Sequence, residues 1–232
     1  MELINGILIA RGDQPADLVL KNAQLVNVLT DEIYTTDIVI AGSRVVAVGE
    51  GYKGHETIDL GGRYLCPGFI DAHVHIESSM VPPREFARAV IPHGVTSVVT
   101  DPHEIANVLG LEGIRFMQQD AKHGPLSMYV NASSCVPATH METAGAQLEF
   151  YDLAPLLHDP WVLGLAEVMN YPGVVYTDGR VLEKISAYSG RVIDGHCPGL
   201  TGRLCNNLPR RRQPHQLHLR RELQQLPQVR QR

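Results

Sequence analysis

The spacing of hydrophobic and polar residues divides the chain into two parts. In the first part, runs rich in Val, Ile and Leu are separated by turn residues such as Ala41-Gly42-Ser43. This spacing predicts short strands over residues 17–28, 33–40 and 44–48. We predict that residues 1–64 form a small antiparallel sheet, and we interpret it as a structural part because it contains few groups with catalytic chemistry.

From Cys66 onward, apolar runs alternate with segments compatible with helices, and successive runs start about 28 to 35 residues apart. That distance is the length of a strand, a helix and two loops. The predicted strands cover residues 68–75, 96–100, 127–132, 162–168 and 191–196. The predicted helices cover residues 83–91, 104–123, 148–157 and 179–188. Each apolar run ends in a polar residue, which is typical of buried parallel strands with functional groups at their C-terminal ends.

Five such units lie between Cys66 and Leu200. A closed (β/α)8 barrel needs eight units and about 250 residues. The pattern therefore leaves two architectures for residues 65–202, an open doubly wound sheet or a partial barrel.

Residues 203–232 differ in composition from the rest of the chain. They contain eight arginines and a single acid, Glu222, although the whole chain has a net charge of −5. Neither strand alternation nor a helical stripe is present, so we predict a disordered basic tail outside the fold. We hypothesise that a shifted reading frame produced this tail, which the coding DNA around codon 202 would test.

Composition excludes several classes of protein. Hydrophobic residues make up 44% and charged residues 19%, which is typical of a globular chain. No stretch approaches the roughly 18 apolar residues of a membrane span, and residues 1–11 lack a signal-peptide pattern. The four cysteines form no CxxC pair, which indicates reduced thiols. We therefore expect a cytoplasmic protein without a membrane partner.

The most specific motif is PGFIDAHVHIE, residues 67–77. Residues two apart on a strand face the same side, so His73 and His75 project together from the end of the first predicted α/β strand. Two converging imidazoles form half of a metal site, since neutral imidazole is the commonest protein metal ligand. The alternative is a pair of histidines satisfied by hydrogen bonds; Asp71, immediately upstream in the motif, favours the metal site.

These residues resemble the first barrel strand of the amidohydrolase superfamily, which comprises metal-dependent hydrolases on a (β/α)8 barrel with a small β-sandwich. Further strings are similar to those of adenine deaminases, which convert adenine and water to hypoxanthine and ammonia. They are HIESSM, TDPHEIANVLG, SSCVPA, GLAEVMNYPGV and DGHCPGL. The resemblance covers roughly residues 10–200. It implies a partial TIM-like barrel of about five βα units, preceded by a portion of the β-sandwich.

The resemblance also implies a binuclear metal site. His73 and His75 would bind from the first strand, Glu167 would bridge two cations from the fourth, and His196 would bind from the fifth. Two adjacent divalent cations turn water into a hydroxide that attacks the ring. Mixed imidazole and carboxylate ligands leave the metal open among Mn²⁺, Fe²⁺ and Zn²⁺, and the resemblance favours the first two. The structural alternative for Glu167 is an ion pair with a nearby Lys or Arg.

Polar side chains near the strand ends are candidate substrate contacts. They are Glu77, Ser78, Asp101, His103, Glu104 and Ser134. Three of them have an alternative role: Glu77 and Ser78 could cap the next helix, and Asp101 could cap the helix predicted from Glu104. Asp101 and His103 could also support the metals from outside. Nothing marks Cys135 as an activated thiol.

The family mechanism also uses a histidine from the sixth barrel strand and an aspartate from the eighth as acid and base. This chain has neither match, since His215 and His218 stand in surroundings that resemble no strand. We therefore expect weak or no activity from this chain, and a homodimer for an intact family member.

Two other functions are the alternatives. The first is another cyclic amidohydrolase, which the HIESSM and DPHE strings disfavour. The second is a non-catalytic fragment whose arginine-rich tail binds nucleic acid, which the lack of interleaved aromatic residues disfavours. A zinc nucleoside deaminase is excluded because the chain has no PCxxC motif.

Overall fold

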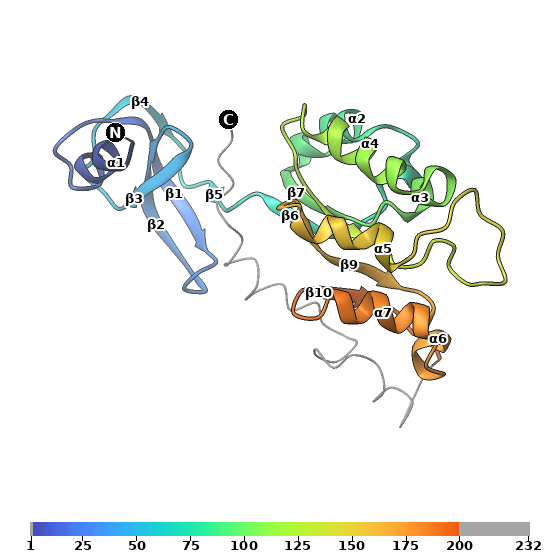
Figure 1. The fold of residues 1–232 in the computed structure, drawn as a ribbon. Coiled ribbons are helices and arrows are strands. Elements are labelled where there is room, and N and C mark those ends of the chain that lie inside the picture. Colours follow the sequence, from blue (N-terminus) through green and yellow to red (C-terminus); the bar gives the residue numbers. More distant parts are fainter. Residues whose placement is uncertain (1, 200–232) are drawn as a thin grey trace. The chain divides into compact units, whose positions relative to one another are not determined.

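The computed structural model describes residues 2–199 and divides the chain into two compact units, one ending at Pro67 and the other starting at Gly68 (Figure 1). The boundary predicted after residue 64 falls three residues before this division. The tail predicted at 203–232, with its reading-frame hypothesis and its nucleic-acid alternative, lies outside the described residues. Each unit is described separately below.

Unit 1 is a five-stranded sheet with one helix. Its elements are α1 (Glu2–Ala10), β1 (Ala16–Asn27), β2 (Glu32–Ala41), β3 (Arg44–Val48), β4 (Gly54–Asp59) and β5 (Tyr64–Leu65). The three predicted strands are present, and β2 pairs antiparallel with both β1 and β3. The prediction of a purely antiparallel sheet is wrong, because β4 and β5 both pair parallel with β1.

The helix α1 of unit 1 was not predicted. Its Ile9 is only 2% exposed and packs with Ala16, Val19 and Val39 of the sheet, all fully buried. The helix therefore covers apolar surface that the sheet alone would leave in water.

Unit 2 contains a parallel sheet in the order β10-β9-β8-β7-β6. The strands are β6 (Phe69–Val74), β7 (Val95–Thr100), β8 (Ser127–Ala132), β9 (Val162–Val168) and β10 (Val192–Gly195). Every strand lies next to the strand that precedes it in the chain, whereas a doubly wound sheet reverses its order at a switch point. The sheet curls into a half-barrel of five strands (Figure 1). The partial barrel is confirmed, and the doubly wound alternative is excluded.

Helices follow the strands of unit 2, joined by short 3₁₀ turns. They are α2 (Pro83–Val90), α3 (His103–Leu109), α4 (Leu111–Ala121), α5 (Phe150–Leu153), α6 (Tyr171–Val175) and α7 (Gly179–Ala187). The 3₁₀ turns are η1 (Ile76–Ser79), η2 (Ile91–His93) and η3 (Ala154–His158). The single helix predicted over 104–123 is two helices, because Gly110 adopts φ 60° and ψ −140° between them. Glycine tolerates this backbone conformation, and a helix cannot continue through it.

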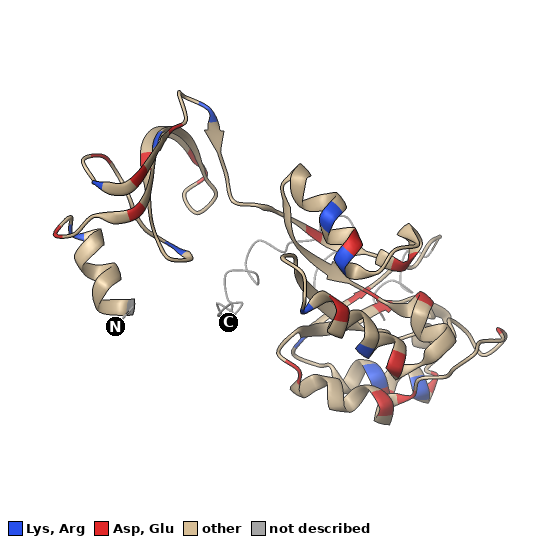
Figure 2. Ribbon diagram, turned by 90° about the horizontal axis from the view of Figure 1, so that it is seen from above, with Lys and Arg blue, Asp and Glu red and all other residues tan. Residues whose placement is uncertain are grey.

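The core of unit 2 lies between the sheet and the helices. Val98 of β7, Val130 of β8 and Leu165 of β9 are fully buried against helix residues such as Ile114 and Met117. Burial is lower in the two outer strands, where Phe69 of β6 is 60% exposed. Acidic and basic residues are interspersed over the helices (Figure 2). Among the described residues, the helices are too short or too polar to cross a membrane.

Candidate metal centre

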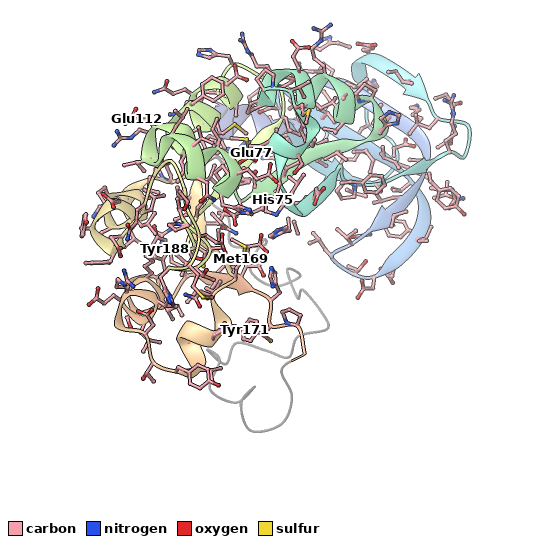
Figure 3. All side chains as sticks on the ribbon, turned by 90° about the vertical axis from the view of Figure 1, so that its right-hand side faces the viewer. His75, Glu77, Glu112, Met169, Tyr171 and Tyr188 are labelled. Carbon is pink, nitrogen blue, oxygen red and sulfur yellow. The ribbon has the colours of Figure 1, made fainter. Side chains whose placement is uncertain are left out.

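The polar ends of the unit 2 strands meet at one edge of the sheet. His73 belongs to β6 and His75 follows it; Glu167 belongs to β9, and His196 follows β10. Parallel strands present their carboxyl ends at the same edge, which is where α/β barrels place their functional groups. Figure 3 shows His75 and Glu77 on the segment that leaves β6.

Glu167 is the centre of this arrangement. Its Oε1 lies 3.2 Å from Nε2 of His75, 3.7 Å from Nδ1 of His103 and 3.9 Å from Nε2 of His73. Its Oε2 lies 3.2 Å from Nε2 of His196. The carboxylate is 10% exposed. The structure thus brings together the four side chains that the sequence predicts as metal ligands, and it adds His103.

A tighter group lies within this arrangement. One ligand atom from each of His75, Asp101, His103 and Glu167 lies within 4.8 Å of the other three. Imidazole nitrogens and carboxylate oxygens together suit a divalent cation of the first transition row. Asp101 and His103, predicted as substrate contacts, therefore lie among the candidate ligands.

The hydrogen bonds of the imidazoles fit the same interpretation. Nδ1 of His73 bonds Oδ2 of Asp194 at 2.9 Å, and Nδ1 of His75 bonds the Asp101 carbonyl oxygen at 2.9 Å. A metal-ligating histidine usually engages a carboxylate or carbonyl through one ring nitrogen and the metal through the other. The remaining Nε2 atoms of His73 and His75 lie only 3.1 Å apart. These residues fit a divalent metal at this place.

Asp101, which follows β7, supports the site with both carboxylate oxygens. Oδ1 accepts a hydrogen bond from the Ser133 hydroxyl at 2.8 Å, and Oδ2 bonds Nδ1 of His103 at 3.1 Å. The second bond raises the pKa of His103 above its ordinary value, against the lowering effect of burial. The alternative that Asp101 caps α3 is wrong, because that helix starts after Pro102 without a side-chain cap.

Glu77, Ser78 and Glu104 form a separate group beside the centre. The Ser78 hydroxyl donates to Oε1 of Glu104 at 2.7 Å, and the Ile105 amide donates to Oε1 of Glu77 at 3.3 Å. Burial raises the pKa of Glu77, whose Oε2 is buried without a partner among the described residues. The alternative that Glu77 and Ser78 cap α2 is wrong, since α2 starts after Pro82 without a side-chain cap.

Glu77 and Glu104 also line a mainly apolar groove of about 510 Å³, together with Met80, Ile105 and Phe116. The residues that line this groove do not include the members of the metal-ligand cluster. A role for Glu77, Ser78 and Glu104 in substrate binding therefore stays a prediction.

Ser134 is buried and reaches the backbone of the central residue. Its hydroxyl donates to the Glu167 carbonyl oxygen at 2.7 Å. The predicted contact with substrate stays a prediction, and the observed contact supports β9 at the metal centre. Cys135, which follows it, is 5% exposed.

Sequence reasoning missed Asp194, which orients His73 from the opposite outer strand. A signal was available, because Asp194 and His196 are two residues apart on a strand, as His73 and His75 are. The role of His103 as a candidate ligand was also missed, since it follows its strand at a distance that loop geometry determines.

Comparison with known proteins gives one matching family model, that of the amidohydrolase family, over residues 64–208. The adenine deaminase of Desulfatibacillum aliphaticivorans is 54% identical over 198 residues, which are 84% of this chain and 35% of that protein. Adenine deaminase 2 of Carboxydothermus hydrogenoformans is 51% identical over 195 residues, covering 84% and 34% respectively. The chain thus spans about a third of the length of these relatives.

Solved structures show the same fold at low sequence identity. The D-hydantoinase from a Thermus species has a TM-score of 0.51 and 20% identity, over 78% of this chain and 40% of its own. A D-aminoacylase has a TM-score of 0.53 and 18% identity, over 78% of this chain and 45% of its own.

Proposed function

This chain belongs to the amidohydrolase family, and on that premise we propose that it forms part of an adenine deaminase, which hydrolyses the exocyclic C–N bond of adenine to give hypoxanthine and ammonia. Two relatives at 51% and 54% identity bear that name. The observation that supports the proposal most strongly is the division of Glu167 between two groups of histidines. One carboxylate oxygen faces His75 and the other faces His196.

We propose that this division serves a binuclear site. His73, His75 and Glu167 would hold one cation, and Glu167 and His196 would contribute to the second. Mn²⁺ and Fe²⁺ are the metals we favour, with Zn²⁺ as the alternative, because the ligand set of imidazoles and carboxylates accommodates all three. When bound, the pair of cations lowers the pKa of water and polarises the carbon that is attacked.

The residues of this chain would orient the centre and neutralise its charge. Asp194 fixes the ring of His73, and the Asp101 carbonyl fixes the ring of His75, so both Nε2 atoms face the metal position. The Asp101 carboxylate, itself held by Ser133, fixes the ring of His103. These contacts set ring orientation before a metal arrives, which reduces the cost of organising the site on binding.

The proposed activity is tested with a chimera, because the chain spans about a third of its relatives. Residues 1–199 of this chain replace the matching segment of the Desulfatibacillum aliphaticivorans adenine deaminase. With Mn²⁺ and adenine, we expect steady formation of hypoxanthine, followed by ultraviolet absorbance. The variant Glu167→Gln should lose at least about 100-fold in rate, since it removes the charge that joins the two cations.

The matched control is Glu183→Gln, an exposed glutamate of α7, which should leave the rate unchanged. A folded, metal-loaded chimera that hydrolyses a cyclic amide and leaves adenine intact would favour the alternative cyclic amidohydrolase. The 232-residue chain alone, assayed in the same way, should show little or no hypoxanthine formation.

Three further expectations stay predictions. They are the homodimer of an intact family member, the cytoplasmic location, and the absence of nucleic-acid binding.

A further inference from the structure

Lys184 of α7 has an unusual set of partners for an ammonium group. Its Nζ donates to the carbonyl oxygens of Ser134, at 3.0 Å, and Leu148, at 2.5 Å. Among the described residues it has no carboxylate within ion-pair distance. Burial lowers the pKa of Lys184. Burying an ammonium group that has only backbone partners lowers the stability of the fold. We therefore expect the two hydrogen bonds of Lys184 to have a role other than stabilisation.

The two carbonyl groups lie at the two ends of one loop. Ser134 follows β8, and Leu148 precedes α5; the Leu148 amide also donates to the Val136 carbonyl at 2.9 Å. Lys184 therefore closes this loop at its base.

The same loop base continues to the metal centre. While the Ser134 carbonyl accepts from Lys184, the Ser134 hydroxyl donates to the Glu167 carbonyl at 2.7 Å. Two hydrogen bonds therefore connect the ammonium to the backbone of the residue that faces four histidines. Ser134 is 5% exposed and Glu167 is 8% exposed, so water competes weakly for these bonds.

We propose that Lys184 is a positioning residue of the metal centre, which sets the place of the Glu167 carboxylate through Ser134. The inference rests on the proposed function for the existence of that centre. A residue of α7, the helix that follows β9 and α6 in the chain, would then influence the metal affinity of the site at the end of β9.

Arg191 offers a matched control at the other end of the same strand. It also donates from a cationic side chain to two backbone carbonyls, those of Val162 at 2.8 Å and Leu157 at 2.6 Å. Val162 is the first residue of β9, whereas Glu167 is near its end. Arg191 thus contacts the first residue of β9 directly, whereas Lys184 reaches the other end of that strand through Ser134, beside the candidate ligands.

The test measures Mn²⁺ binding to the full 232-residue chain by the electron paramagnetic resonance signal of free Mn²⁺. Lys184→Met keeps the aliphatic stem and removes the donors; we expect its affinity to fall by about 10- to 100-fold, as for other residues that orient metal ligands. Arg191→Met should bind within about threefold of the unmodified chain, because its two acceptors lie at or before the start of β9, whereas Glu167 lies near the end of that strand. Equal losses in both variants, or normal binding by Lys184→Met, would overturn the proposal.

Ser134→Ala tests the connection itself, including the case in which Lys184→Met does not fold. It removes only the hydroxyl that reaches Glu167, and we expect a loss of about tenfold. Adding Lys184→Met to it should cause little further loss, because the connection is already broken. Normal Mn²⁺ affinity in folded Ser134→Ala, or full additivity in the double variant, contradicts the proposal.

A second measurement separates this inference from the proposed function. If the unmodified chain does not bind Mn²⁺, the proposed metal centre is contradicted. Amide hydrogen exchange over residues 165–169 then still tests whether Lys184 holds the backbone around Glu167. Faster exchange there in Lys184→Met than in Arg191→Met supports the positioning role. Equal exchange in the two variants overturns it.

Discussion

The central and outer strands of unit 2 make different contributions to the candidate metal centre. Asp101, which follows β7, and Glu167, in β9, have side chains only 2% and 10% exposed. His73, in β6, and His196, which follows β10, are 30% and 56% exposed. The central strands therefore supply buried carboxylates, and the outer strands supply most of the imidazoles from more open positions.

This difference indicates which half of the centre is fixed by the fold. Asp101 and Glu167 both accept hydrogen bonds from the segment that follows β8, through Ser133 and Ser134. The first bond holds the Asp101 carboxylate, and the second holds the backbone of Glu167, before any metal binds. Among the described residues of the outer strands, Asp194 gives comparable support to His73, and its own side chain is 28% exposed. We infer that the two carboxylates are positioned before metal binding, and that the histidines of the outer strands complete the ligand set.

The sharpest test compares two carboxylate–histidine pairs. Asp101→Asn replaces an acceptor of two hydrogen bonds by a group with one acceptor, and it leaves a buried donor unpaired. We expect the free energy of unfolding to fall by about 3 kcal/mol. Asp194→Asn, in the outer pair with His73, should cost less than about 1 kcal/mol, because solvent screens it. Urea unfolding followed by the fluorescence of the single tryptophan, Trp161, measures both. Equal losses in the free energy of unfolding for the two variants would contradict the difference between central and outer strands.

A second test concerns the contact between β9 and β10. Gly164 pairs with Val192, and a Cβ at residue 164 would collide with the Val192 carbonyl. Gly164→Ala should therefore push β10 away, lowering the free energy of unfolding by about 2 kcal/mol. Because Asp194 and His196 move with β10, Mn²⁺ affinity should fall as well.

Its control is Gly179→Ala at the start of α7, where an added Cβ meets no atom within 4 Å. That variant should be neutral or slightly stabilising, since alanine favours helix. Loss of stability in both glycine variants would show that the chain is simply intolerant of substitution near β10.

The smallest expected effect depends on pH. Tyr188 is 1% exposed, its hydroxyl donates to the Leu153 carbonyl at 2.9 Å, and burial raises its pKa to about 12 (Figure 3). The folded state favours the neutral phenol, so stability is fully present below pH 10 and is lost as the pH rises from 10 toward 12. By pH 11 the loss should be about 1 kcal/mol.

Tyr188→Phe should remove this pH dependence, while costing about 1 kcal/mol at neutral pH for the lost hydrogen bond. Urea unfolding at pH 8 and pH 11 gives both values. A variant that loses stability above pH 10 as steeply as the unmodified chain would show that another group titrates there.

The sequence predicts the elements of unit 2 best where burial is complete. Strands β8 and β9 begin and end where their apolar runs do, because both faces of a central strand need apolar residues. The pairing of β4 with β1 in unit 1 was not predictable in this way. The direction of a strand in a sheet depends on how the chain crosses over, and local hydrophobicity does not encode it.

The candidate site shows the same limit. His73 and His75 were found because both lie at a strand end, where alternation determines the facing side, whereas Glu167 and His196 were named because the resemblance to the amidohydrolase superfamily implies ligands at later strand ends. His103 enters the cluster from a helix that starts after a bend at Pro102, and no periodicity predicts where such a ring points. Ser134 and Lys184 act through backbone carbonyls, which leave no trace in residue type.

The sequential strand order of unit 2 has a consequence for synthesis. A ribosome releases about 5–20 residues per second, and each strand emerges to find its partner already made. Assembly can then advance in one direction without waiting for distant sequence. On this schedule, His73 and His75 emerge first, Asp101 and Glu167 follow, and His196 emerges last, so the last candidate ligand joins a site whose two carboxylates are already present.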